Sequence, residues 1–144
     1  MIEVIIFIII MLIASFFDIK YKRIPIFLIV ALFIVSSISM ICDIVLGNVD
    51  IITSVAILIP GLTVVGLCLM KFDSIGIGDG FVLTSMGLLM GVSQYVMSLS
   101  IAAVITCIEA IIHIVFFKAD KDSTLPFVPS LTVGTVLGVI LCAK

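Results

Sequence analysis

Long uninterrupted runs of apolar residues, separated by short polar segments, dominate the sequence. The runs cover Ile2–Phe17, Ile24–Ile41, Ile51–Met70, Ile75–Met90, Val92–Phe117 and Phe127–Cys142. A membrane-spanning helix needs about 20 apolar residues, with a range of roughly 17 to 25. Because the runs are continuous rather than alternating, they favour helices over the strands of a membrane barrel. The pattern predicts an all-α, polytopic membrane helix bundle with six transmembrane helices.

Composition points the same way. Of the 144 residues, 64% are hydrophobic and 11% are charged, and the mean hydropathy is +1.58. A soluble domain is nearer half apolar and a quarter charged. Because no polar stretch is long enough for a second domain, we expect residues 1–144 to form a single transmembrane domain. The run that starts at Ile2 lacks a basic start and a small-residue cleavage site, so we expect it to remain as the first span.

The basic residues indicate how the bundle is oriented. Six of the seven fall in three loops, after the first, third and fifth runs: Lys20, Lys22, Arg23, Lys71, Lys118 and Lys121. With six spans these loops share one side, and Lys144 alone falls on the other. The positive-inside rule makes the shared side cytoplasmic. We therefore expect both termini outside and a multi-pass protein of the cytoplasmic (inner) cell membrane.

Two acids are the strongest candidates for chemistry. Asp79 is the last residue of the stretch Gly76-Ile77-Gly78-Asp79, and Asp18 directly follows the first apolar run. The two glycines remove side-chain bulk beside Asp79, so other parts of the chain can approach its carboxylate. An acid at membrane depth is a functional candidate by default, whereas a plain helix N-cap is the alternative for Asp79. Both acids are expected at the cytoplasmic surface of the bilayer.

Two carboxylates that lie close together at a site partly shielded from water can share one proton. The ionised acid then activates a water molecule while the protonated acid donates to the scissile carbonyl, which needs no metal or cofactor. Asp79 lies near the start of its helix and Asp18 near the end of its own. A helix N-terminus favours a carboxylate and a C-terminus disfavours one. This predicts Asp79 as the base and Asp18 as the acid.

Glu109 and His113 lie four residues apart inside an apolar run and so share one helix face. A hydrogen-bonded structural pair is the favoured interpretation, with a proton relay or a substrate contact as the alternative. Two ligands are too few for a metal site. The four cysteines show no Cys-x-x-Cys pairing and are expected to act as small apolar residues. No nucleic-acid partner is expected.

Three elements in this order resemble the type IV prepilin peptidase family of bacterial membrane aspartic proteases. They are Asp18 followed by a basic loop with Arg23 and Ile24-Pro25, the Gly-x-Gly-Asp of Gly76, Gly78 and Asp79, and the Pro-Phe-x-Pro of Pro126, Phe127 and Pro129. The resemblance implies a peptidase that cleaves the leader peptide of type IV prepilins or pseudopilins at the cytoplasmic membrane face. It also implies that Asp18 and Asp79 are catalytic and that the partners are the substrate and membrane lipid.

The chain departs from the family pattern at two positions. Ile26 stands where the family usually has Asn, and Phe81 stands where a Lys often follows the second Asp. These departures bear on substrate preference and fine positioning more than on the reaction. The cytoplasmic segment with paired cysteines that larger members carry is absent, so the chain is similar to the compact members without the methyltransferase segment.

Two other functions stay open. A presenilin-like intramembrane protease shares Gly-x-Gly-Asp, but it has Tyr where Phe17 precedes Asp18 here, and its Pro-Ala-Leu element does not occur. A small non-enzymatic cation or proton transporter, or an assembly component, would use Asp18, Asp79, Glu109 and His113 as a path. The sequence leaves the particular prepilin and the oligomeric state open.

Overall fold

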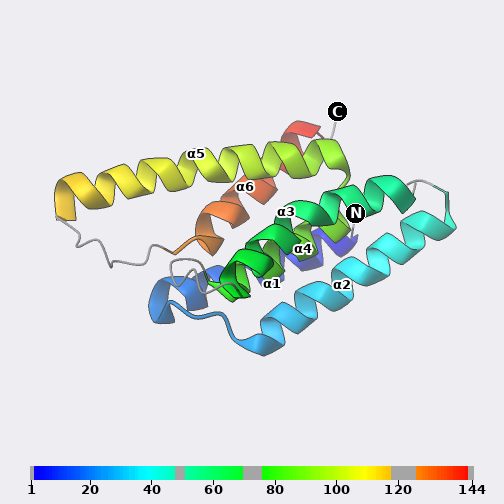
Figure 1. Ribbon diagram of the computed structural model, residues 1–144, viewed down its shortest axis with the longest axis horizontal. Coiled ribbons are helices and arrows are strands. Elements are labelled where there is room, and N and C mark those ends of the chain that lie inside the picture. The colour runs from blue at the N-terminus through cyan, green and yellow to red at the C-terminus, as the bar shows by residue number, and fades with distance from the viewer. Residues whose placement is uncertain (1, 48–50, 70–75, 118–125, 143–144) are drawn as a thin grey trace.

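The computed structural model describes residues 2–47, 51–69, 76–117 and 126–142, which form helices and no strand (Figure 1). The helices are α1 (Ile2–Tyr21), α2 (Ile26–Val45), α3 (Ile51–Leu69), α4 (Ile77–Leu89), α5 (Val92–Phe117) and α6 (Val128–Cys142). The all-α prediction is confirmed for these residues, and the helix bounds lie within a few residues of the apolar runs. Of the basic residues used to orient the bundle, Lys71, Lys118, Lys121 and Lys144 lie outside the described residues.

Three of the described helices, α1, α2 and α5, are long and apolar enough to cross a membrane. The surface of α1 shows why. Ile5, Ile9 and Leu12 recur every three or four residues and are exposed, while Phe7 and Met11 are buried. A soluble helix would place polar residues on its exposed face. An apolar exposed stripe is the surface that lipid covers.

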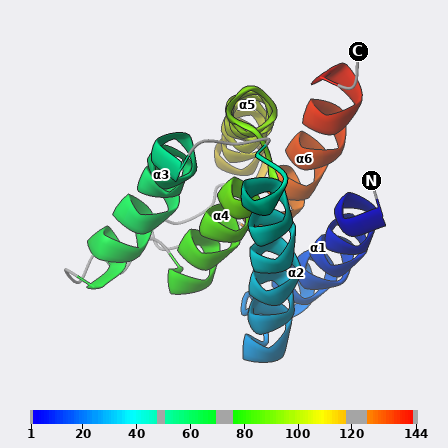
Figure 2. The same cartoon turned by 90° about the vertical axis from the view of Figure 1, so that its right-hand side faces the viewer.

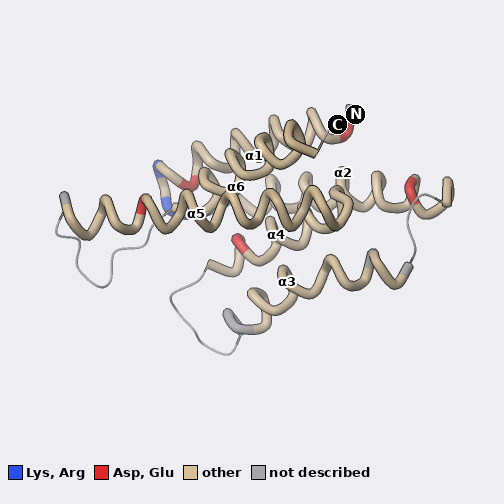
Figure 3. The backbone as a smooth tube through the Cα atoms, turned by 90° about the horizontal axis from the view of Figure 1, so that it is seen from above, with Lys and Arg blue, Asp and Glu red and all other residues tan. Residues whose placement is uncertain are grey.

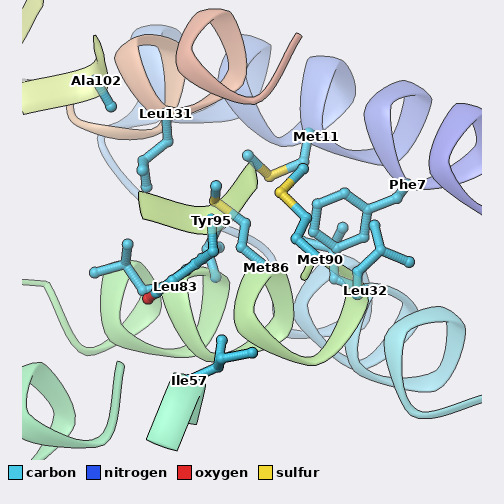
Figure 4. Close-up of a cluster of buried hydrophobic side chains, with 12 residues drawn as sticks. Phe7, Met11, Leu32, Ile57, Leu83, Met86, Met90, Tyr95, Ala102 and Leu131 are labelled. Atoms are coloured by element: carbon cyan, nitrogen blue, oxygen red, sulfur yellow. The ribbon is translucent and has the colours of Figure 1, made fainter. Parts of the chain in front are cut away.

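Helix α4 lies at the centre of the bundle, between α3 and α2 (Figure 2). All of its residues from Val82 to Gly87 are buried. They join a core to which α1, α2 and α6 contribute Met11, Leu32 and Leu131 (Figure 4). With 13 residues, α4 is about 20 Å long, shorter than the hydrocarbon core of roughly 30 Å. The structure therefore surrounds α4 with protein along most of its length.

Helix α6 packs closely on α5 through two glycines four residues apart. A Cβ atom at Gly134 would lie 3.0 Å from Ala102, and one at Gly138 would overlap Ser98. Glycines at this spacing allow two helices to approach closely. This packing positions the first turn of α6 beside the last turn of α1.

Candidate active site

Asp18 lies in the last turn of α1 and is 7% exposed. The apolar run ends at Phe17, but the helix continues for one more turn to Tyr21. The rings of Phe17 and Tyr21 stack with centroids 5.8 Å apart, a pairing at four-residue spacing that supports a helix. The helix stops at Lys22, whose φ of 50° is left-handed and whose N–H donates to the Asp18 carbonyl oxygen at 2.9 Å.

The carboxylate of Asp18 is held by the first turn of α6. The backbone N–H of Val128, the first residue of α6, donates to Asp18 Oδ2 at 3.1 Å. Pro126 and Pro129 flank this amide and have no N–H of their own. The Pro-Phe-x-Pro element thus leaves few free donors at the start of α6, and one of them serves Asp18. A carboxylate at a helix N-terminus is in a favourable position.

A second polar contact joins the same two helices one turn further from the end. The hydroxyl groups of Ser15 on α1 and Thr132 on α6 lie 2.6 Å apart, and both residues are buried. Thr132 Oγ1 also donates to the Val128 carbonyl oxygen at 2.8 Å. A buried hydroxyl without a partner costs free energy, so these bonds favour a single register of α6 against α1.

Asp79 lies in the first turn of α4, three residues after Gly76. Gly76 is the N-cap, so the N-cap alternative for Asp79 is wrong. The N–H of Asp79 donates to the Gly76 carbonyl oxygen at 3.0 Å, and the carboxylate folds back to the Gly76 backbone N–H. This is the returning half of a capping box. A Cβ atom at position 76 would lie 3.2 Å from Asp79 Oδ2, so the glycine leaves room for the carboxylate.

The second glycine of the element serves a different contact. A Cβ atom at Gly78 would lie 3.1 Å from Ile24 Cδ1. Ile24 belongs to the segment between α1 and α2, directly before Pro25. Pro25 is the N-cap of α2, and the first helical residue is Ile26. Gly78 therefore lets the start of α4 approach the segment that follows Asp18.

One open cavity of about 1120 Å³ contains both acids. Asp18 and Asp79 both line it, although they come from different helices. The other members of the three sequence elements that line it are Lys22, Arg23, Ile24, Gly76, Ile77, Gly78 and Pro126. Figure 3 shows acidic positions of α1 and α4 toward the end of the bundle away from the termini. The structure thus brings together elements that lie far apart in the sequence.

The cavity continues along one apolar face of α2. Its wall there includes Val30, Phe33, Ser37 and Ile41, which recur at helical spacing. The two departures from the family pattern also line it: Ile26 at the start of α2, and Phe81, whose ring meets that of Phe33 edge-on at 5.9 Å. Both departures make the wall apolar. This wall could not be predicted from the sequence, because most of α2 is equally apolar.

Glu109 and His113 are not among the residues that line the cavity. Glu109 accepts a hydrogen bond from Ser130 Oγ at 2.8 Å, which is a link from α5 to α6. His113 lies one turn further along α5 and is partly buried. Among the described residues, no group of three or more His, Cys, Asp or Glu side chains could hold a metal ion.

The hydrogen bond from α6 also bears on the predicted roles of the two acids. The C-terminal end of α1 disfavours a carboxylate at Asp18, but the N-terminal end of α6 favours one there. The two helix ends oppose each other at Asp18. The helix ends therefore favour an ionised Asp79 over an ionised Asp18 less strongly than α1 and α4 alone would suggest. The assignment of Asp79 as the base and Asp18 as the acid stays a prediction.

A family model described as the type IV leader peptidase family matches residues 5–111. The matched stretch includes Asp18 and the Gly-x-Gly-Asp element, and it ends before α6. No curated protein and no solved structure matches the chain.

Proposed function

The chain belongs to the type IV leader peptidase family, and we propose that it is an aspartic-type endopeptidase that cleaves the leader of type IV prepilins or pseudopilins. The observation that carries the proposal is the presence of Asp18 and Asp79 in one cavity at one end of the bundle. Their separate origins, in α1 and α4, argue against a chance pair of surface acids. We place the cleavage at the cytoplasmic face of the cell membrane.

The proposed reaction uses the two carboxyl groups and one water molecule. The ionised carboxylate takes a proton from the water as its oxygen attacks the scissile carbonyl carbon, and the protonated acid donates to the carbonyl oxygen. When the resulting tetrahedral intermediate collapses, the C–N bond breaks and the leaving amine takes a proton from the site. The burial of Asp18 and its bond to Val128 keep one carboxyl group oriented throughout.

The apolar wall of the cavity suits the substrate class. A prepilin presents a polar leader followed by an apolar helix. The stretch of α2 from Ile26 to Ile41 is about 24 Å long at 1.5 Å per residue. It could lie beside several turns of an apolar substrate helix, with the scissile bond at the acids. Lys22 and Arg23 line the same cavity and would contact the polar leader.

The transporter alternative fits less well. It needs Asp18, Asp79, Glu109 and His113 along one path, but only the two aspartates line the cavity. A presenilin-like protease would use the same chemistry on a different substrate, so only a substrate test separates it from the proposed function.

Co-expression with a candidate prepilin in a host that lacks its own peptidase is the direct test. We expect the prepilin to lose the mass of its leader when the enzyme is present, measured by mass spectrometry of the membrane fraction. Asp79→Asn, expressed at the same level, is the inactive control. An unchanged prepilin mass across several candidate substrates, with the wild-type enzyme folded in the membrane, would refute the proposal.

The proposed location has a separate test. In a variant without native cysteines, single cysteines at Lys121 and Asn48 are labelled in intact cells with a reagent that does not cross the membrane. Both positions lie outside the described residues. We expect position 48 to react from outside and position 121 to react only after the cells are opened. The opposite pattern would place the acids on the wrong side for a leader peptidase.

A further inference from the structure

Glu109 on α5 has a hydrogen bond that the proposed reaction does not use. The hydroxyl group of Ser130 donates to Glu109 Oε2 at 2.8 Å, and Ser130 is fully buried. A carboxyl group on an apolar helix is costly unless it is engaged, so such a contact favours one arrangement of the two helices. The bond ties α5 to the first turn of α6.

The same turn of α6 holds Asp18. Val128, two residues before Ser130, donates its N–H to Asp18 Oδ2 at 3.1 Å. The N–H of Leu131 donates to the carbonyl oxygen of Phe127 at 3.1 Å and closes the turn that contains both residues. Because backbone atoms in a hydrogen-bonded turn move together, a shift of Ser130 would also shift the amide that holds Asp18.

We propose that Glu109 is a positioning residue for Asp18. It fixes the first turn of α6 through Ser130, and that turn orients the Asp18 carboxylate through the Val128 amide. The contacts run from α5 to α6 to α1, and they assign a role in the reaction to an acid outside the cavity. The inference rests on the proposed function, because it treats Asp18 as the group that must be oriented.

The chain provides a matched control for this contact. Ser39 Oγ on α2 donates to Glu3 Oε2 on α1 at 2.6 Å. This is the same kind of bond between two helices, but Glu3 belongs to the first turn of α1 and Asp18 to its last. In Figure 3, acidic positions of α1 and α5 lie toward the end of the bundle away from the termini, and another acidic position of α1 lies beside the N-terminus. Loss of the Ser39–Glu3 bond removes a helix contact without touching the α6 turn.

The first experiment measures kcat and KM for prepilin cleavage by purified full-length variants. We expect Glu109→Ala and Ser130→Ala each to lower kcat by about tenfold with little change in KM, because Asp18 is misoriented rather than the substrate lost. The double variant should be no slower than either single one. Glu109→Gln keeps an acceptor for Ser130 and should restore most of kcat. Glu3→Ala and Ser39→Ala should leave kcat within about twofold of the wild type.

Two results would overturn the inference in an active enzyme. One is a kcat for Ser130→Ala within about twofold of the wild type. The other is an equal loss in the Glu3 and Ser39 variants, which would show a general packing effect. Ser130→Ala removes only a hydroxyl group, so it carries the test if Glu109→Ala does not accumulate.

Hydrogen exchange gives a measurement that is independent of activity. The amides of the turn from Phe127 to Leu131 should exchange at least about fivefold faster in Glu109→Ala than in the wild type, and Glu3→Ala should not change them. If the wild type cleaves no prepilin, the proposed function fails and exchange alone decides the positioning role. Unchanged exchange in Glu109→Ala would then refute it.

Discussion

The two candidate catalytic acids are held in opposite ways. The Asp79 carboxylate is fixed by its own element, through Gly76 three residues earlier. The Asp18 carboxylate is fixed by Val128, which is 110 residues away in sequence and belongs to another helix. The position of the Asp79 carboxylate therefore depends on residues of its own element, whereas that of the Asp18 carboxylate depends on how α6 packs against α1. A carboxyl pair for hydrolysis needs both, since neither acid alone provides a base and an acid.

This difference predicts which substitutions should alter the orientation of each carboxylate. Changes in α5 or α6 should act on Asp18, whereas Asp79 should respond to changes in its own Gly-x-Gly-Asp element. Four experiments test this difference, and they are given in order of decreasing expected loss of activity.

Removing either carboxylate should abolish cleavage, because the reaction requires both acids even though they are held in place by different contacts. Asp18→Asn and Asp79→Asn should each lower the rate of prepilin cleavage by at least about a hundredfold. Both proteins should remain in the membrane. Glu3→Gln, which keeps its acceptor for Ser39, should cleave normally. Near-normal processing by either Asn variant would remove that acid from the reaction.

Removing the amide that holds Asp18 should test the support from α6. Val128→Pro deletes the N–H, and proline is tolerated at the first position of a helix. A hydrogen bond to a charged group contributes about 1.5–3 kcal/mol, so kcat should fall by about 10- to 100-fold. Val128→Ala is the matched control, because it loses the buried side chain but keeps the N–H. Equal kcat values for the two variants would show that packing, and not the amide, is what matters at this position.

The local support of Asp79 should be sensitive to a single methyl group. Gly76→Ala places a Cβ atom 3.2 Å from Asp79 Oδ2, and we expect a loss of about tenfold in kcat as the carboxylate turns away. Gly78→Ala should cost less, since the Cβ atom meets the flexible end of Ile24. Hydrogen exchange of the α6 turn should be normal in both variants. Faster exchange there would show that the two supports are coupled.

The smallest effect should come from the aromatic pair that lines the α2 side of the cavity. Phe33 and Phe81 meet edge-on at 5.9 Å, and such a pair contributes about 0.5–1.5 kcal/mol beyond its burial. Phe33→Ala and Phe81→Ala should each raise KM severalfold and leave kcat nearly unchanged, because they bind substrate rather than react. A fall in kcat without a change in KM would instead assign the pair to the support of Asp79.

The approximate extents of the helices and the two candidate acids could be predicted from the sequence alone. Continuous apolar runs predicted the described helices to within a few residues, because a chain in lipid must satisfy its backbone internally. The Gly-x-Gly-Asp element was also readable, since its support for Asp79 acts over three residues. The end of α1 was missed by one turn, because the contact of Phe17 with Tyr21 extends a helix beyond its apolar run.

Contacts between side chains of different helices could not be predicted from the sequence. The bond from Val128 to Asp18, the bond from Ser130 to Glu109 and the Phe33–Phe81 contact each depend on how a helix is rotated about its axis. In a soluble protein a polar face fixes that rotation. Here the lipid-facing and core-facing sides are both apolar, as Ile9 and Met11 on α1 illustrate. The apolar pattern therefore carries no information on rotation, and close packing with a few buried hydrogen bonds decides it.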